Sequence, residues 1–143
     1  MKRFWLGLML AMIIGVFYTW LQAPEWLENW NSEHQALVEQ QRTSGAEFGR
    51  NSDQQGCFDN ALQRIEACQQ TEYNCTISGG FYLKACWQQS LPSDNFCAGV
   101  PAFSDEMSED DKAWIKDSCF ELGATAKGCR LLMKQKMQHC SAG

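Results

Sequence analysis

The chain has 143 residues, eight cysteines and a formal net charge of −5 at pH 7. Without its apolar N-terminus it is near the size of one small domain, which argues against a multi-site enzyme. The acidic balance and the lack of clustered Lys and Arg argue against nucleic acid as a partner.

The N-terminal segment, residues 1–23, is expected to be a transmembrane signal anchor. The run FWLGLMLAMIIGVFYTWL at 4–21 has no charged residue, and as a helix it would cover about 27 Å, close to the hydrocarbon core of a bilayer. Lys2 and Arg3 precede the run and acidic residues follow it, which places the N-terminus on the cytoplasmic side.

This anchor predicts a single-pass protein of the bacterial inner membrane with its C-terminal domain in the periplasm. The alternative is the mitochondrial inner membrane, facing the intermembrane space. A cleaved signal peptide is the competing interpretation of the apolar run. The only candidate cleavage site, after Leu21-Gln22-Ala23, has a large residue at the minus-three position and is followed by Pro24. Both features disfavour cleavage, so a retained anchor is favoured.

Residues 24–43 predict an amphipathic juxtamembrane helix, because apolar side chains recur at helical spacing after Pro24, which suits a first turn. Trp26 and Trp30 lie one turn apart in it. We interpret them first as membrane-interface anchors and second as a partner contact. Residues 44–55 hold two glycines among Ser, Asn, Asp and Gln and predict a linker or loop.

Residues 56–143 are expected to form a disulfide-bonded helical domain, and its first four cysteines are arranged symmetrically. Cys57 and Cys68 are eleven residues apart, as are Cys75 and Cys86, so each pair lies on one helical face. Two antiparallel helices would bring Cys68 to Cys75 at the turn and Cys57 to Cys86 at the open end. Four cysteines allow three pairings, and this choice depends on symmetry and helical phase.

The spacing Cys57-x10-Cys68 with Cys75-x10-Cys86 resembles the twin Cys-x9-Cys and Cys-x10-Cys helical hairpins of mitochondrial intermembrane-space proteins. The resemblance covers residues 57–86, and it implies the same nested pairing and a structural or assembly role. Gly79-Gly80 departs from a clean second helix. Two glycines would cost roughly 2 kcal/mol in a helix interior, so the return helix is expected to begin near Gly80.

The second half predicts a crossing loop at residues 88–105, a helix capped by Ser108, and a last helix at about residues 125–139. Cys119 and Cys129 are equidistant from Ala124, which predicts that they close the turn between these helices. By elimination Cys97 meets Cys140. The competing interpretation is that all eight cysteines are reduced and buried in a cytosolic protein. The predicted anchor argues against this interpretation.

The sequence contains no recognisable catalytic or cofactor motif. Neither Cys-x-x-Cys nor Cys-x-x-Cys-His occurs, and the short ligand spacings of structural zinc sites are absent. The residues Met133, Met137, His139 and Cys140 include soft copper ligands, but core methionines beside a terminal histidine are the favoured interpretation. We therefore expect no enzyme, no cofactor and no metal.

The predicted fold is all-α: a transmembrane helix followed by a small disulfide-stapled bundle of about four to five helices in two hairpins. The expected function is a non-catalytic, membrane-anchored interaction or accessory subunit that presents this domain on the periplasmic side to another membrane or periplasmic protein. Candidate partner-binding residues are Trp26, Trp30, Trp87 and Trp114. The alternatives are a periplasmic immunity protein or toxin inhibitor, and a thiol-redox or metal-handling protein.

Overall fold

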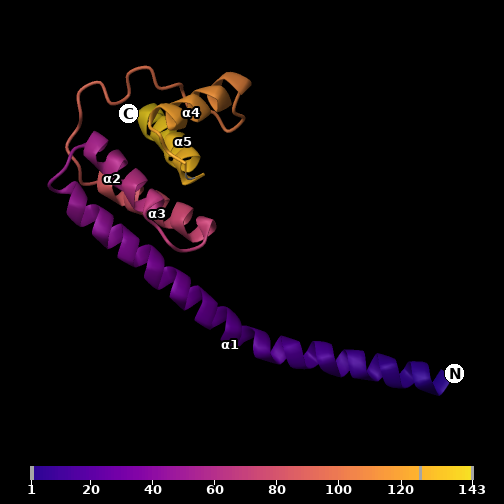
Figure 1. Cartoon of the computed structure of the whole chain (residues 1–143). Coiled ribbons are helices and arrows are strands. Elements are labelled where there is room, and N and C mark those ends of the chain that lie inside the picture. The colour runs from indigo at the N-terminus through magenta and orange to yellow at the C-terminus, as the bar shows by residue number, and fades with distance from the viewer. Residues whose placement is uncertain (1, 126, 143) are drawn as a thin grey trace. The chain divides into compact units, whose positions relative to one another are not determined.

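The computed structural model describes the backbone of residues 2–125 and 127–142, and side chains at residues 4–5, 7–20, 32, 34–125 and 127–142. This part of the chain is helical, as predicted (Figure 1). Its α-helices are α1 (Lys2–Gly49), α2 (Gln54–Glu66), α3 (Glu72–Trp87), α4 (Glu109–Glu121) and α5 (Gly128–Ser141). The chain divides into two compact units, Met1–Leu37 and Val38–Gly143, which are described separately.

In the first unit, the described apolar side chains of α1 are exposed, from Phe4 (73 %) to Trp20 (71 %). No helix of the described residues combines the length and the apolar character needed to cross a membrane. The predicted transmembrane signal anchor, and the single-pass location in a bacterial or mitochondrial inner membrane, are therefore wrong. The predicted span included Leu6 and Leu21, which lie outside the described side chains.

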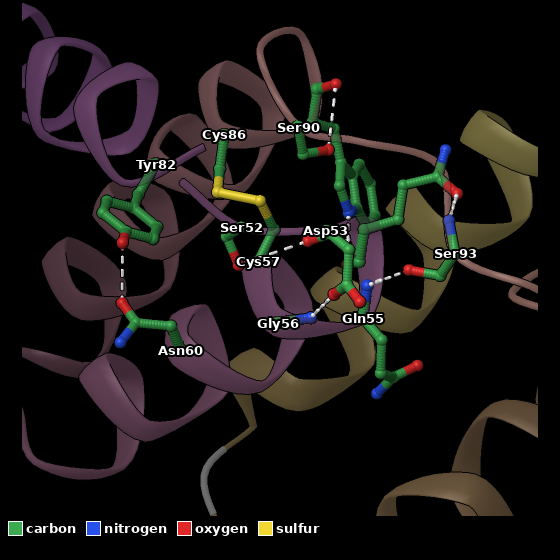
Figure 2. Close-up of a disulfide and its surroundings, with 12 residues drawn as sticks. Ser52, Asp53, Gln55, Gly56, Cys57, Asn60, Tyr82, Cys86, Ser90 and Ser93 are labelled. Carbon is green, nitrogen blue, oxygen red and sulfur yellow. Dashed lines mark hydrogen bonds between the residues drawn. A yellow bond between two sulfur atoms is a disulfide. The ribbon is translucent and has the colours of Figure 1, made fainter. Parts of the chain in front are cut away.

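The second unit contains two helical hairpins, α2–α3 and α4–α5, and α3 also packs against α5. The helix α2 begins after Asp53, whose carboxylate accepts a hydrogen bond of 2.7 Å from the Gly56 N–H (Figure 2). This bond satisfies one of the amide groups that the first turn of a helix leaves without a partner. The faces of α2 and α3 that meet bury Phe58, Ile65 and Leu83 in the core.

Four disulfides brace the second unit, and they join the same residues as the pairing predicted from spacing and, for Cys97 and Cys140, by elimination. The bridge Cys57–Cys86 links α2 to α3 (Figure 2), and Cys68–Cys75 closes the turn between them. In the second hairpin Cys119–Cys129 links α4 to α5. The bridge Cys97–Cys140 ties the loop before α4 to the end of α5.

The return helix differs from the prediction, because α3 begins at Glu72, with Thr71 as its cap, and runs through both glycines. A Cβ atom at Gly79 would collide with the side chain of Ile65 in α2. A Cβ at Gly80 would lie within 3.2 Å of Leu131 and within 2.9 Å of Gln135 in α5. The glycines therefore allow α2 and α5 to approach α3 closely, and this packing offsets their low helix propensity.

The segment expected to be a loop, residues 44–55, is helical up to Gly49. Within the second unit this end of α1 lies against α3. A Cβ at Gly45 would collide with the backbone carbonyl of Tyr82, and one at Gly49 would collide with the carbonyl of Cys86. The two glycines are four residues apart in α1, and Tyr82 and Cys86 are four residues apart in α3. The two glycines therefore form a shallow strip along α1 that the backbone of α3 fills.

The second hairpin begins at a capping box, in which Ser108 and Asp111 bond to each other's backbone N–H groups. The last helix begins at Gly128 rather than at residue 125. Thr125 instead donates two hydrogen bonds of 2.9 Å, from its N–H and its hydroxyl, to the carboxylate of Glu66. These bonds fasten the turn between α4 and α5 to the end of α2.

Candidate binding surface

The four predicted tryptophan contacts do not form one surface in the described part of the chain. The side chains of Trp26 and Trp30 lie outside the described residues. Trp87 is buried, with 7 % of its surface exposed, and its indole N–H donates a bond of 3.0 Å to the backbone carbonyl of Gln54. Trp114 is partly buried against the core. Trp87 and Trp114 therefore serve packing in the second unit.

Two grooves border the exposed side of α3 in the second unit, and Lys84 and Gln88 line both of them. These two residues form the ridge between the grooves, and we call the ridge and its grooves the α3 face. The groove between α1 and α3 has a volume of about 470 Å³ and is lined by Glu39, Arg42, Thr43, Ala46, Phe81, Lys84, Ala85 and Gln88. The α3–α5 groove has a volume of about 460 Å³ and is lined by Lys84, Trp87, Gln88, Gln135, Gln138, His139 and Ala142.

The α3 face carries positive charge on a chain that is acidic as a whole. Lys84 is exposed, and no described carboxylate lies within ion-pairing distance of its ammonium group. The Arg42 guanidinium lies over the ring of Phe81, 5.3 Å from its centroid, which favours the cation electrostatically. Glu39 is the one acidic side chain among the described lining residues. The surface therefore suits a partner that brings negative charge.

The wall of the α3–α5 groove is held in place by a polar network around Gln54. Its side-chain oxygen accepts a bond of 3.1 Å from the Ser93 N–H, which fixes the orientation of the amide because an N–H can only donate. Its Nε2 lies 2.9 Å from Nε2 of His139. The ring nitrogen must accept here, so His139 is neutral with its proton on Nδ1.

The environment of His139 is aromatic and partly buried. Its ring stacks on Trp87 at 4.6 Å between centroids, and Phe96 packs edge-on at 6.1 Å. Burial lowers the pKa of His139, because desolvation disfavours the imidazolium form. Stacking and the bond from Gln54 therefore make this residue a fixed part of the groove wall.

Gln135 contributes an unusual feature to the same groove. Its side-chain oxygen is buried and has no hydrogen-bond partner among the described residues. Buried acceptors are normally paired, and an unpaired one costs about 1–3 kcal/mol. The amide is confined on its other side by the close approach of Gly80. The oxygen is therefore an unsatisfied acceptor within the packing of α5 and is not accessible to a ligand in the groove.

The residues considered for redox or metal chemistry have other partners. All eight cysteines are in the four disulfides. Met133 and Met137 are buried in the core, Cys140 is bonded to Cys97, and His139 contacts Gln54. Within the described residues no three His, Cys, Asp or Glu side chains are grouped so that they would hold a metal ion.

No family model matches the chain, and no curated protein and no solved structure is detectably similar to it.

Proposed function

We propose that this chain is a non-catalytic interaction subunit and that its α3 face binds another protein. The observation that carries the proposal is the position of Lys84, a cation with no described ion-pair partner on the ridge between two grooves. An unpaired lysine beside concave, partly apolar surface provides charge complementarity to a binding partner.

The construction of the second unit supports this role. Two disulfides brace the α2–α3 hairpin, and two brace α4, α5 and the loop before them, so each hairpin is held in one arrangement before anything binds. Preorganisation of this kind reduces the ordering cost of association. Four bridges in a small domain also support an oxidising compartment as the place where the protein works.

The experiment is affinity capture from native extract with the full chain and two charge-reversal variants. Lys84→Glu reverses the ridge, and Lys116→Glu is the matched control, because Lys116 is an exposed lysine on α4 outside both grooves. We expect Lys84→Glu to reduce the recovery of the captured partner at least tenfold and Lys116→Glu to leave it unchanged. Equal recovery with both variants would refute the α3 face as the binding surface. Circular dichroism and intact-mass analysis of the four disulfides check that each variant is folded.

A further inference from the structure

The four disulfides differ in the exposure of their cysteines. All eight cysteines belong to the described residues, and Cys97 is the one among them that is fully exposed at the surface. Its partner Cys140, near the end of α5, is partly buried. By contrast, both cysteines of Cys57–Cys86 and both cysteines of Cys119–Cys129 are buried in the core. Exchange requires a thiolate to reach a sulfur atom, so exposed bridges are the labile ones.

The bridge Cys68–Cys75 is the nearest competitor, because Cys68 is partly exposed while Cys75 is buried. It closes a sequence separation of 7 residues, against 43 for Cys97–Cys140. A short loop keeps two reduced cysteines close together, so their bond re-forms readily, and this advantage falls as the loop lengthens. Cys97–Cys140 is therefore the bridge that a thiol reaches first and that stays open longest.

The bridge attaches the segment around Cys97 covalently to α5, next to the α3–α5 groove. The backbone–backbone hydrogen bonds of residues 93–100 stay within this segment, such as the bond of 2.9 Å from the Ala98 N–H to the Asn95 carbonyl. Phe96 is buried and packs edge-on against Trp87 at 5.7 Å and against His139 at 6.1 Å between centroids. Both of these rings line the groove, so the bridge holds in place a residue that supports the groove wall.

We propose that Cys97–Cys140 is a thiol-exchange site through which a dithiol reductant controls the α3–α5 groove. One thiolate of the dithiol attacks the Cys97 Sγ, the bond to Cys140 breaks, and Cys140 leaves as a thiolate that takes up a proton. The second thiol loses its proton and attacks the mixed disulfide, which releases Cys97 as a thiol. The bridge gains two electrons, and the dithiol loses two and becomes a disulfide.

Opening the bridge frees the segment from α5 and withdraws Phe96 from the wall formed by Trp87 and His139. The groove then loses the shape that the partner binds. This consequence rests on the proposed interaction function, whereas the exchange itself requires no partner.

The exchange is measured on the purified full chain with graded concentrations of dithiothreitol. Free thiols are trapped with iodoacetamide and located by peptide mass mapping. Cys97–Cys140 should be reduced at least tenfold faster than each other bridge, and the chain opened only there should show faster amide hydrogen exchange around Phe96. Earlier reduction of another bridge would overturn the proposal, as would unchanged hydrogen exchange around Phe96.

The effect on binding is measured by affinity capture from native extract with two paired variants. Cys97→Ser with Cys140→Ser fixes the open state. Cys68→Ser with Cys75→Ser is the matched control, because this bridge closes the turn between α2 and α3, outside the residues that line the two grooves. The open variant should recover at least fivefold less partner than the control.

Equal recovery with the two paired variants would overturn the control of the groove, and a loss with Lys84→Glu in the same assay would leave the interaction function standing. If the open variant does not fold, the chain reduced only at Cys97–Cys140 and trapped with iodoacetamide takes its place. Its recovery is compared with that of the oxidised chain, and the same fivefold loss is expected.

Discussion

Gly45 of α1 lies so close to the backbone carbonyl of Tyr82 in α3 that no Cβ atom fits between them. Gly49 has the same relationship one turn later with the carbonyl of Cys86. These contacts hold the end of α1 on α3 in the second unit and so form one wall of the groove lined by Arg42 and Phe81.

Gly45→Ala is therefore expected to destabilise the second unit. The added methyl group would force the helices apart, at a cost of roughly 1–3 kcal/mol for overpacking. The higher helix propensity of alanine would offset up to about 1 kcal/mol of this cost. The control is Gly15→Ala in the same helix, where no atom lies within 4 Å of the added Cβ. Urea unfolding should show a lower midpoint for Gly45→Ala alone, and equal midpoints for both variants would contradict the close contact.

The four disulfides should contribute unequally to stability. Cys57–Cys86 closes a sequence separation of 29 residues and Cys68–Cys75 one of 7. The chain-entropy model gives about 3.6 kcal/mol for the longer loop and about 2.4 kcal/mol for the shorter one. Replacing both cysteines of each bridge by alanine should therefore lower the free energy of unfolding more for Cys57–Cys86, whose cysteines are also fully buried. A larger loss for the inner bridge would contradict this ranking.

The contact between Gln54 and His139 predicts a pH-dependent stability. Burial lowers the pKa of His139 in the folded protein, so the unfolded chain binds its proton first as the pH falls. The neutral ring therefore contributes fully to the free energy of unfolding above pH 6.5, the ordinary pKa of histidine. This contribution is lost as the pH falls from there through the lowered pKa of the folded protein. Protonation would also place two donors against each other at Gln54.

The measurement is the urea midpoint at pH 7.5 and pH 5.0 for the unmodified chain and for His139→Gln. Glutamine does not titrate and its side-chain oxygen accepts a hydrogen bond. The loss of stability between the two pH values should be smaller in the variant. An identical loss in both proteins would show that other groups cause the dependence.

Most of the disulfide framework could be predicted from the sequence because helical periodicity fixes the direction of most of the cysteines, whereas Cys97 lies in the loop before α4 and its pairing followed by elimination. Spacings of eleven residues place Cys57 and Cys68 on one face, and the symmetry of the two legs determines the register. A local signal such as the cap at Ser108 depends only on neighbouring residues, and the structure contains it.

The glycines were misinterpreted because the same residue marks a break in a helix and a close approach between helices. Only the neighbouring element distinguishes the two, and the side chain of Ile65 and the carbonyl of Tyr82 become neighbours only in the folded chain. The candidate site was missed for a related reason. Lys84 and Gln88 are one turn apart in the sequence, but Gln135 is distant from them and joins them only because α5 packs on α3.

The central claim, that the α3 face is covered by a protein partner, is tested most directly by lysine labelling. The reactivity of Lys84 towards an acetylating reagent is compared in the purified chain and in native extract, with Lys116 as the internal reference in the same molecule. Both side chains are exposed in the structure. Lys84 should become at least several-fold less reactive in the extract, while the reactivity of Lys116 should not change. Equal reactivity of Lys84 in both preparations would contradict it.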